Sequence, residues 1–223
     1  MRPQEKKLYK PVFHFIKNHF KCFNSEEKAI NKGPLIAGRA DIVGVRDIGG
    51  WVSGDIEVIV VEVKRNISSF GRKLGEAFGY SVFAHRCYLA VFLEKNEKLT
   101  NLHKDMAAKI GVGLIGIRKK YRTYQCEEIT TAPRNEPNVY FLNLLLWEIG
   151  LVKCCICRCY HENNATRKLK SSLRMNKSFR YEKNYNEPYG EKGIIWDFKG
   201  KWSKGFWICH TCLSKVILAN NKG

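Results

Sequence analysis

The sequence is short of long apolar runs, of acidic residues and of any leader-like N-terminus. No apolar stretch approaches the roughly 18–20 continuous residues that a membrane-spanning helix needs. The first twenty residues, MRPQEKKLYKPVFHFIKNHF, are charged and lack the apolar segment of a signal peptide. Because both features of a membrane or secreted protein are missing, we expect an intracellular protein, located in the cytoplasm.

Acidic residues are scarce relative to basic ones. The chain has 21 Asp and Glu against 39 Lys and Arg, which gives a net charge of +18. Such an excess favours a polyanionic partner, because each cation that meets a phosphate releases condensed counterions. A membrane surface is the alternative partner, but nucleic acid is the usual one for a chain this basic.

Apolar periodicity predicts an α/β fold in the first two thirds of the chain. A helix is expected over 5–23, beginning or kinked at Pro11, because proline disrupts helix interiors. The later predicted elements are strands at 42–45, 58–64, 86–93 and 111–117, and helices at 68–84, 99–110 and 139–150. Helices that alternate with strands in this way predict a mixed sheet flanked by helices.

The composition changes after Gly150. Residues 151–223 hold 15 Lys and Arg against five Asp and Glu, and they also hold six of the nine cysteines. We therefore predict two domains, an α/β domain at 1–150 and a small, basic, cysteine-rich module at 151–223. In a reducing compartment, clustered cysteines favour a metal site over disulfides.

The stretch VIVVEVKRN (58–66) places charges at the end of a buried strand. Side chains two positions apart point the same way in a strand, so Glu62 and Lys64 share a face. Asp41 begins the preceding strand, and in a hairpin the start of one strand lies beside the end of the next. Asp41 and Glu62 should therefore converge, although a plain ion pair between Glu62 and Lys64 at a strand end is the structural alternative.

Two converging carboxylates repel each other unless a cation lies between them. Oxygen ligands select hard cations, so Mg²⁺ or Mn²⁺ is the expected occupant. Lys64 beside such a metal can help to deprotonate or orient a water and can neutralise charge on a phosphate. Glu5, or the pair Glu26 and Glu27, is left open as a further ligand.

The predicted helix at 68–84 carries glycines at every fourth position. Gly71, Gly75 and Gly79 form a stripe, which we interpret as a close approach of the helix backbone to the sheet. Glu76 and Tyr80 lie beside this stripe and are placed to lean over the metal site. For Glu76 the alternative is an ion pair with Arg72 one turn earlier.

GRADIVGV and GDIEVIVVEVKRN resemble the motif of the PD-(D/E)xK nuclease superfamily, whose members have a restriction-endonuclease-like fold. The resemblance covers residues 5–117, with Ala40 in place of the motif's proline. It implies that Asp41 and Glu62 bind the divalent metal and that Lys64 assists the attacking water. Similar nucleases also carry a Gln or Glu followed by Tyr on the next helix, which here are Glu76 and Tyr80. The implied activity is phosphodiester hydrolysis by an endonuclease or exonuclease, with DNA favoured over RNA by the habit of the superfamily.

Two CxxC pairs, Cys154/Cys157 and Cys209/Cys212, predict a structural Zn²⁺ site in the second module, which resembles a zinc ribbon. The 51 residues between the pairs exceed the usual ribbon spacing and indicate an inserted loop. Other candidate ligands keep the ligand set open: Cys155, Cys159, His161 and His210. An iron–sulfur cluster is the alternative, as in some nucleases of this superfamily, with Cys22 as its upstream ligand.

The inserted loop interleaves basic and aromatic residues. Cations can follow a nucleic-acid backbone while aromatic faces stack on bases, although some aromatics must also form the module's small core. The predicted nucleic-acid-binding residues are Arg167, Lys168, Lys170, Arg174, Lys177 and Arg180. The sequence thus predicts a metal-dependent nuclease with a nucleic-acid-binding zinc module. The alternatives are a catalytically inactive nucleic-acid-binding protein with the same fold and a zinc-dependent regulator.

Overall fold

The structure is a computed structural model that describes residues 3–34, 37–49, 55–154, 159–162, 166–169, 194–196, 202–204 and 206–209. Beyond His161 it describes the backbone alone. The chain divides into two compact units, residues 1–48 with 56–149 and residues 49–55 with 150–223. None of the described helices is long and apolar enough to cross a membrane.

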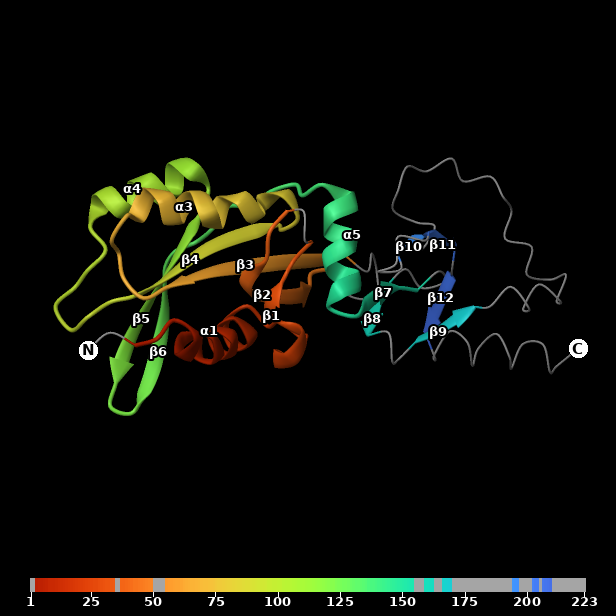
Figure 1. Ribbon diagram of the computed structural model, residues 1–223, viewed down its shortest axis with the longest axis horizontal. Helices are drawn as coiled ribbons and strands as arrows, with labels where there is room; N and C mark the ends of the chain where they lie inside the picture. Colours follow the sequence, from red (N-terminus) through yellow and green to blue (C-terminus); the bar gives the residue numbers. More distant parts are fainter. Residues whose placement is uncertain are drawn as a thin grey trace, which may run out of the picture. The chain divides into compact units, whose positions relative to one another are not determined.

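A six-stranded mixed sheet forms the centre of the first unit, with its strands in the order of the chain (Figure 1). The strands are β1 (Ile30–Lys32), β2 (Ala40–Asp47), β3 (Ile56–Lys64), β4 (Arg86–Phe92), β5 (Gly113–Lys120) and β6 (Thr123–Thr130). β3, β4 and β5 run parallel to one another, and the other neighbours pair antiparallel. The central strands β3 and β4 are almost wholly buried because both of their faces are covered.

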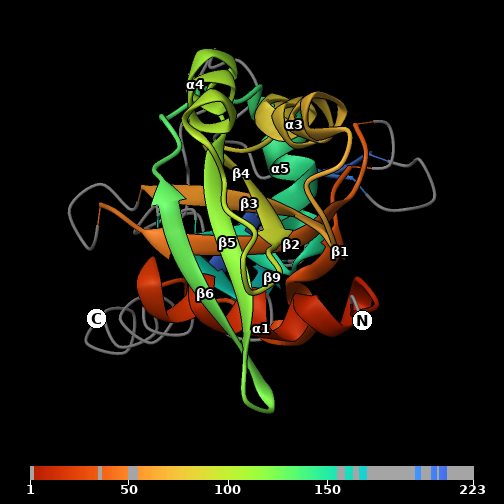
Figure 2. The same cartoon turned by 90° about the vertical axis from the view of Figure 1, so that its left-hand side faces the viewer.

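Helices cover both faces of this sheet, which confirms the predicted mixed α/β architecture. α1 (Lys6–His19) lies on one face, while α3 (Phe70–Gly79) and α4 (Asn101–Ile110) lie on the other (Figure 2). α3 connects β3 to β4, and α4 connects β4 to β5. Parallel crossovers are right-handed, so two successive crossovers in one direction place their helices on the same face. The unit also contains α5 (Val139–Glu148) and the short 3₁₀ helices η1 (Glu26–Lys28) and η2 (Tyr80–Val82).

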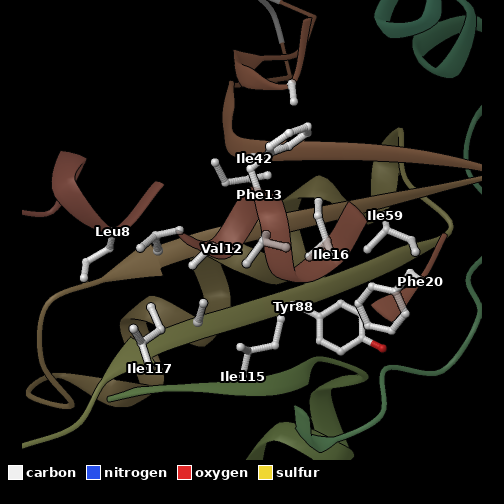
Figure 3. Packing of buried hydrophobic residues seen from close by; sticks show 14 of the residues in the cluster. Leu8, Val12, Phe13, Ile16, Phe20, Ile42, Ile59, Tyr88, Ile115 and Ile117 are labelled. Carbon is white, nitrogen blue, oxygen red and sulfur yellow. The ribbon is translucent and has the colours of Figure 1, made fainter. Parts of the chain in front are cut away.

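The larger apolar core lies between α1 and the sheet. Leu8, Val12 and Ile16 recur at helical spacing and are fully buried against β2–β5 (Figure 3). Phe20 extends this core past the end of α1, where its ring lies 5.2 Å from that of Tyr88. A second cluster joins α3 and α4 to the opposite face of the sheet.

Two predicted helix boundaries differ from the observed ones. α1 begins at Lys6, so Pro11 lies inside the helix instead of starting it. The helix predicted at 68–84 ends at Gly79 and continues as the 3₁₀ turn η2. Ser69 occupies the N-cap position of α3 in the left-handed conformation and makes no capping hydrogen bond with its side chain.

The described strands of the second unit form three antiparallel pairs. β7 (Leu151–Lys153) pairs with β8 (Tyr160–Glu162), and β9 (Thr166–Leu169) pairs with β12 (Phe206–Cys209). β10 (Ile194–Trp196) pairs with β11 (Trp202–Lys204).

Candidate active site

The register of β2 and β3 places Asp41 and Glu62 opposite each other. Ile42 pairs with Val61 across the two antiparallel strands, and one further step of the same register sets Asp41 against Glu62. Side chains directly opposite in such a ladder project to one face, with Cβ atoms about 5 Å apart. The convergence expected from a hairpin is therefore present in the fold.

The Asp41 carboxylate is held at both oxygens. Its Oδ2 accepts a hydrogen bond of 2.8 Å from the backbone N–H of Val63, and its Oδ1 accepts one from the hydroxyl of Tyr9. Tyr9 comes from α1, so the first helix reaches the end of the sheet that bears the acidic pair. The side chain of Asp41 is thereby fixed before any ligand binds.

The Glu62 carboxylate is also held at both oxygens. Its Oε1 lies 2.5 Å from Nζ of Lys64, and its Oε2 accepts a hydrogen bond of 2.7 Å from the hydroxyl of Tyr80. Tyr80 begins η2, directly after α3, and its hydroxyl also lies 3.0 Å from the backbone oxygen of Arg39. Glu62 is only 5% exposed, so these contacts satisfy a largely desolvated group.

Lys64 links the strand to α3. Its Nζ lies 3.0 Å from Oε2 of Glu76, while Oε1 of Glu76 lies 3.5 Å from Nε of Arg72. Both interpretations of Glu76 from the sequence are therefore present in the structure. Glu76 leans toward the acidic pair through Lys64, and it also makes the ion pair one turn back along its helix.

The protonation of the site is set by burial and by the neighbouring charges. Burial raises the pKa of Asp41 above its ordinary value, and hydrogen bonds from Tyr9 and Val63 offset only part of this effect. Burial and the charge of Asp41 also raise the pKa of Glu62. Two carboxylates in this environment are stabilised by a bound proton or by a cation.

The remaining members of the network keep their protons. Burial lowers the pKa of Lys64, but its bonds to Glu62 and Glu76 outweigh this effect and raise the pKa above its usual range. Burial and the nearby carboxylates raise the pKa of the Tyr9 and Tyr80 phenols. Lys64 is therefore an ammonium ion at neutral pH, and both tyrosines remain hydrogen-bond donors.

Glu5, at the N-cap of α1, and Glu26, in η1, have different surroundings. Glu5, one turn before Tyr9, is close enough for its charge to raise the pKa of Asp41. Glu26 faces away from the acidic pair toward Lys10 and His14, each at 3.9 Å. Of Glu5 and Glu26, Glu5 is therefore the one that lies near Asp41. Within the part of the chain that the structure describes, no three His, Cys, Asp or Glu side chains already form a metal-binding cluster.

The interpretation of the glycine stripe on α3 was wrong. Gly71, Gly75 and Gly79 are exposed, and a Cβ atom built on Gly75 or Gly79 would have no neighbour within 4 Å. The face of α3 that contacts the sheet consists of Phe70, Lys73, Leu74 and Ala77. Periodicity located the stripe, but it could not decide which face of the helix points inward.

Sequence reasoning missed Tyr9. It lies beside the apolar stripe of α1, where an aromatic ring is expected to pack, and only its hydroxyl reaches Asp41. Arg39, two residues before Asp41 in the sequence, was also missed. Its guanidinium lies 3.1 Å from the carboxylate of Glu148 in α5. The short distance in sequence between Arg39 and Asp41 was the available signal.

The predicted zinc ligands are described only in part. Cys154 is buried directly after β7, and its N–H donates a 2.9 Å hydrogen bond to the backbone oxygen of Cys159. Cys209 ends β12, a strand that contacts β7. Cys157 and Cys212 lie outside the described residues, as do Cys155 and His210. Burial lowers the pKa of His161.

Cys22, the upstream ligand of the alternative iron–sulfur cluster, lies in the core of the first unit. It is 4% exposed, and a Cβ atom on Gly44 would come within 2.6 Å of its sulfur. Burial raises the pKa of its thiol to about 12. Cys22 is therefore a protonated, tightly packed thiol.

The predicted nucleic-acid-binding residues of the second unit are also described only in part. Arg167 and Lys168 belong to β9, opposite Ile208 and Trp207 of β12. The others lie outside the described residues: Lys170, Arg174, Lys177 and Arg180.

Comparison with known proteins finds a distant structural neighbour and no sequence match. No protein-family model matches it, and no curated protein matches it in sequence. Among solved structures, it is similar to a protein of unknown function from Silicibacter pomeroyi. The two share 17% identity with a TM-score of 0.43, over 67% of this chain and 86% of that one. A likeness this distant carries no conclusion about function.

Proposed function

We propose that the chain is a divalent-metal-dependent nuclease with a restriction-endonuclease-like core of the PD-(D/E)xK type, and that it hydrolyses phosphodiester bonds, most favourably in DNA. One observation carries this proposal. Asp41 and Glu62 face each other at one end of the sheet, and the ammonium group of Lys64 lies 2.5 Å from Glu62. The excess of cations over the whole chain supports a polyanionic substrate.

The residues present fit Mg²⁺ or Mn²⁺. Asp41 and Glu62 would hold the ion, because both are oxygen donors on one face and burial leaves their negative charge poorly solvated. When both carboxylates are ionised, they leave a net negative charge beside Lys64, and the charge of Glu76 is offset by its partner Arg72. When bound, the ion would supply Lewis acidity and lower the pKa of a bound water.

Lys64 has a role that follows from its protonation. Its raised pKa keeps it charged at neutral pH, so it is suited to donate hydrogen bonds and not to accept a proton. It can orient the attacking water and neutralise charge that develops on the phosphate. Glu76 holds the ammonium group in place, and Tyr9 and Tyr80 hold the two carboxylates.

For the second unit we propose that it binds nucleic acid. We also propose that it holds a structural Zn²⁺ through Cys154, Cys157, Cys209 and Cys212. The contact between β7 and β12 supports this, because each strand leads into or ends at one cysteine of a CxxC pair. The placement of Cys22 in the core of the other unit favours zinc over the iron–sulfur alternative.

A catalytically inactive nucleic-acid-binding protein is the second candidate. The observation that favours it is the closed ion network, in which Lys64 satisfies both Glu62 and Glu76 without an added cation. Incubating the full chain with plasmid, linear, branched and single-stranded DNA, each with Mg²⁺ or with EDTA, separates the two. The nuclease cuts at least one substrate with Mg²⁺ and none with EDTA. The inactive protein binds DNA but cuts none of the substrates under either condition.

A further inference from the structure

We propose that the β5–β6 hairpin and the groove between α1 and β6 bind a single-stranded segment of nucleic acid and lead it toward the acidic site. This basic groove lies in the first unit and is distinct from the cysteine module. The inference deepens the proposed nuclease function and rests on it for the destination of the strand. Binding itself is measurable without cleavage.

The hairpin tip carries cations and an exposed aromatic ring. Lys120 pairs with Thr123, so Tyr121 and Arg122 form a two-residue turn. Tyr121 is 90% exposed, and its φ of 55° is a left-handed value that glycine and asparagine adopt far more readily than tyrosine. Lys119 is exposed beside them. An aromatic ring held out in solvent among cations is an arrangement suited to stacking on a base.

The groove behind the hairpin continues this surface. It has a volume of about 800 Å³, and its lining includes Lys7 and Lys10 of α1, Arg122 of the turn and Tyr124 of β6. Phe15 adds a second aromatic ring to the lining. Figure 2 shows the hairpin extending from the sheet past α1. Arg122 belongs to the turn and also lines the groove, so the tip and the groove adjoin.

Few acidic groups oppose this charge. Glu26 lies 3.9 Å from both Lys10 and His14, at the exposed rim of the groove, where such pairs contribute little. Glu128 is already bound by His19 and Tyr88. Among the described residues, no carboxylate lies within ion-pair distance of the other cations of the surface: Lys7, Lys119, Lys120 and Arg122.

The register of the sheet places this surface at the same end as the acidic site. Lys64 pairs with Val91, and Val91 pairs with Gly116, so the last residues of β5 project beyond the level of Lys64. β3 and β5 are two strand spacings apart, or about 10 Å, and the tip lies about 15 Å further along β5. Figure 1 shows the start of α1 at this side as well. The groove lies on the α1 face and the acidic pair projects toward α3, so a strand of several nucleotides would pass around this end of the sheet, where Tyr9 of α1 contacts Asp41.

The aromatic rings favour a single strand over a duplex. In a duplex the base faces are stacked on one another, so Tyr121 and Tyr124 could contact only its sugars and phosphates. In a single strand each base offers a face, and cations along the groove can follow the backbone. The substrate class that we infer is therefore nucleic acid with a single-stranded segment beside the scissile bond.

The test measures binding of the full chain to a fluorescent single-stranded oligonucleotide in EDTA, over a series of salt concentrations. Tyr121→Asn removes the ring but suits the left-handed backbone, and we expect about five-fold weaker binding or more, while Tyr121→Phe stays within about two-fold. The double variant Lys119→Ala/Lys120→Ala should make the slope of log K against log salt shallower by about 1.4, because each lost phosphate contact contributes about 0.7. Lys104→Ala/Lys109→Ala removes the same charge from α4, which does not line the groove, and should leave the slope unchanged.

Three results would overturn the inference. Unchanged affinity in Tyr121→Asn would remove the stacking contact. An equal reduction of the salt dependence of binding in the hairpin and α4 variants would show a general effect of charge. Equal losses for a duplex of the same length would show that the surface does not select single strands. Because every measurement is made in EDTA, failure here is separate from failure of the nuclease proposal, which appears as absent cleavage with Mg²⁺.

Discussion

Asp41 and Glu62 stand opposite each other across β2 and β3, and each carboxylate accepts a hydrogen bond from a tyrosine of a different helical segment. Tyr9 holds one and Tyr80 holds the other. Burial raises the pKa of both acids, so the fold confines two carboxylates where their ionisation is unfavourable. Such a site destabilises the metal-free protein, and binding of the proposed cation would offset this cost.

The first prediction concerns this instability. Because the folded-state pKa values of Asp41 and Glu62 lie above those of the unfolded chain, the folded protein holds protons that the unfolded chain releases. The free energy of unfolding of the metal-free protein should therefore fall as pH rises from about 4 through the folded-state values. Glu62→Gln or Asp41→Asn should raise Tm at pH 7.5 in EDTA, where about 1 kcal/mol corresponds to roughly 2–4 °C.

Mg²⁺ should raise the Tm of the wild type above that of Glu62→Gln. Binding to the folded state alone stabilises it, so Tm of the wild type should rise with Mg²⁺ concentration while Tm of Glu62→Gln stays constant. Scanning calorimetry with and without EDTA measures both effects. Equal responses of wild type and variant to Mg²⁺ would show that Glu62 is not a metal ligand.

The second prediction concerns Glu76, which we assign to positioning Lys64. Glu76→Gln should reduce the cleavage rate roughly 10–100-fold, as is typical when an outer-shell partner is lost, with substrate affinity nearly unchanged. Arg72→Gln removes the other partner of Glu76, an exposed side chain, and should change the rate less than about three-fold. Similar losses in the two variants would assign Glu76 to helix stability instead.

The sequence predicted the part of the site that depends on strand order. Apolar runs identified β3, β4 and β5, and the hairpin between β2 and β3 brought Asp41 beside Glu62. It could not show that Gly75 and Gly79 face solvent, because several faces of α3 carry small or apolar side chains. It also could not show the contact of Tyr9 with Asp41, which depends on the packing of α1 across the sheet.

The third prediction concerns a buried ion cluster that the sequence did not reveal. Glu57 is 2% exposed, with Nε of Arg46 at 2.7 Å and Nε of Arg86 at 3.0 Å from its oxygens. Glu57→Ala leaves two guanidinium groups without their shared partner, and it should destabilise the protein by about 3 kcal/mol. Urea unfolding measures the change. A loss below about 1 kcal/mol would show that solvent compensates both arginines.

The fourth prediction concerns the cysteine module. Protein purified without added metal should contain about one zinc per chain, and Cys154→Ser or Cys209→Ser should lose it. Either variant should also make the second unit more sensitive to proteolysis, because structural zinc supplies folding energy to small domains. Cys22→Ser serves as a control that keeps the zinc. Iron with labile sulfide in place of zinc would establish the cluster alternative.

The most direct test of the central claim is the rate of DNA cleavage by wild type and by Glu62→Gln, each with Mg²⁺ and with EDTA, at equal occupancy of the DNA. Glu62→Gln keeps the shape of the side chain and removes one charge from a proposed metal ligand. We predict cleavage by the wild type with Mg²⁺ alone and a loss of about 100-fold or more in the variant, beyond the 10–100-fold typical of an outer-shell partner. Cleavage by Glu62→Gln at the wild-type rate, or wild-type cleavage that persists in EDTA, would contradict the assignment of Asp41, Glu62 and Lys64 as a metal-dependent nuclease site.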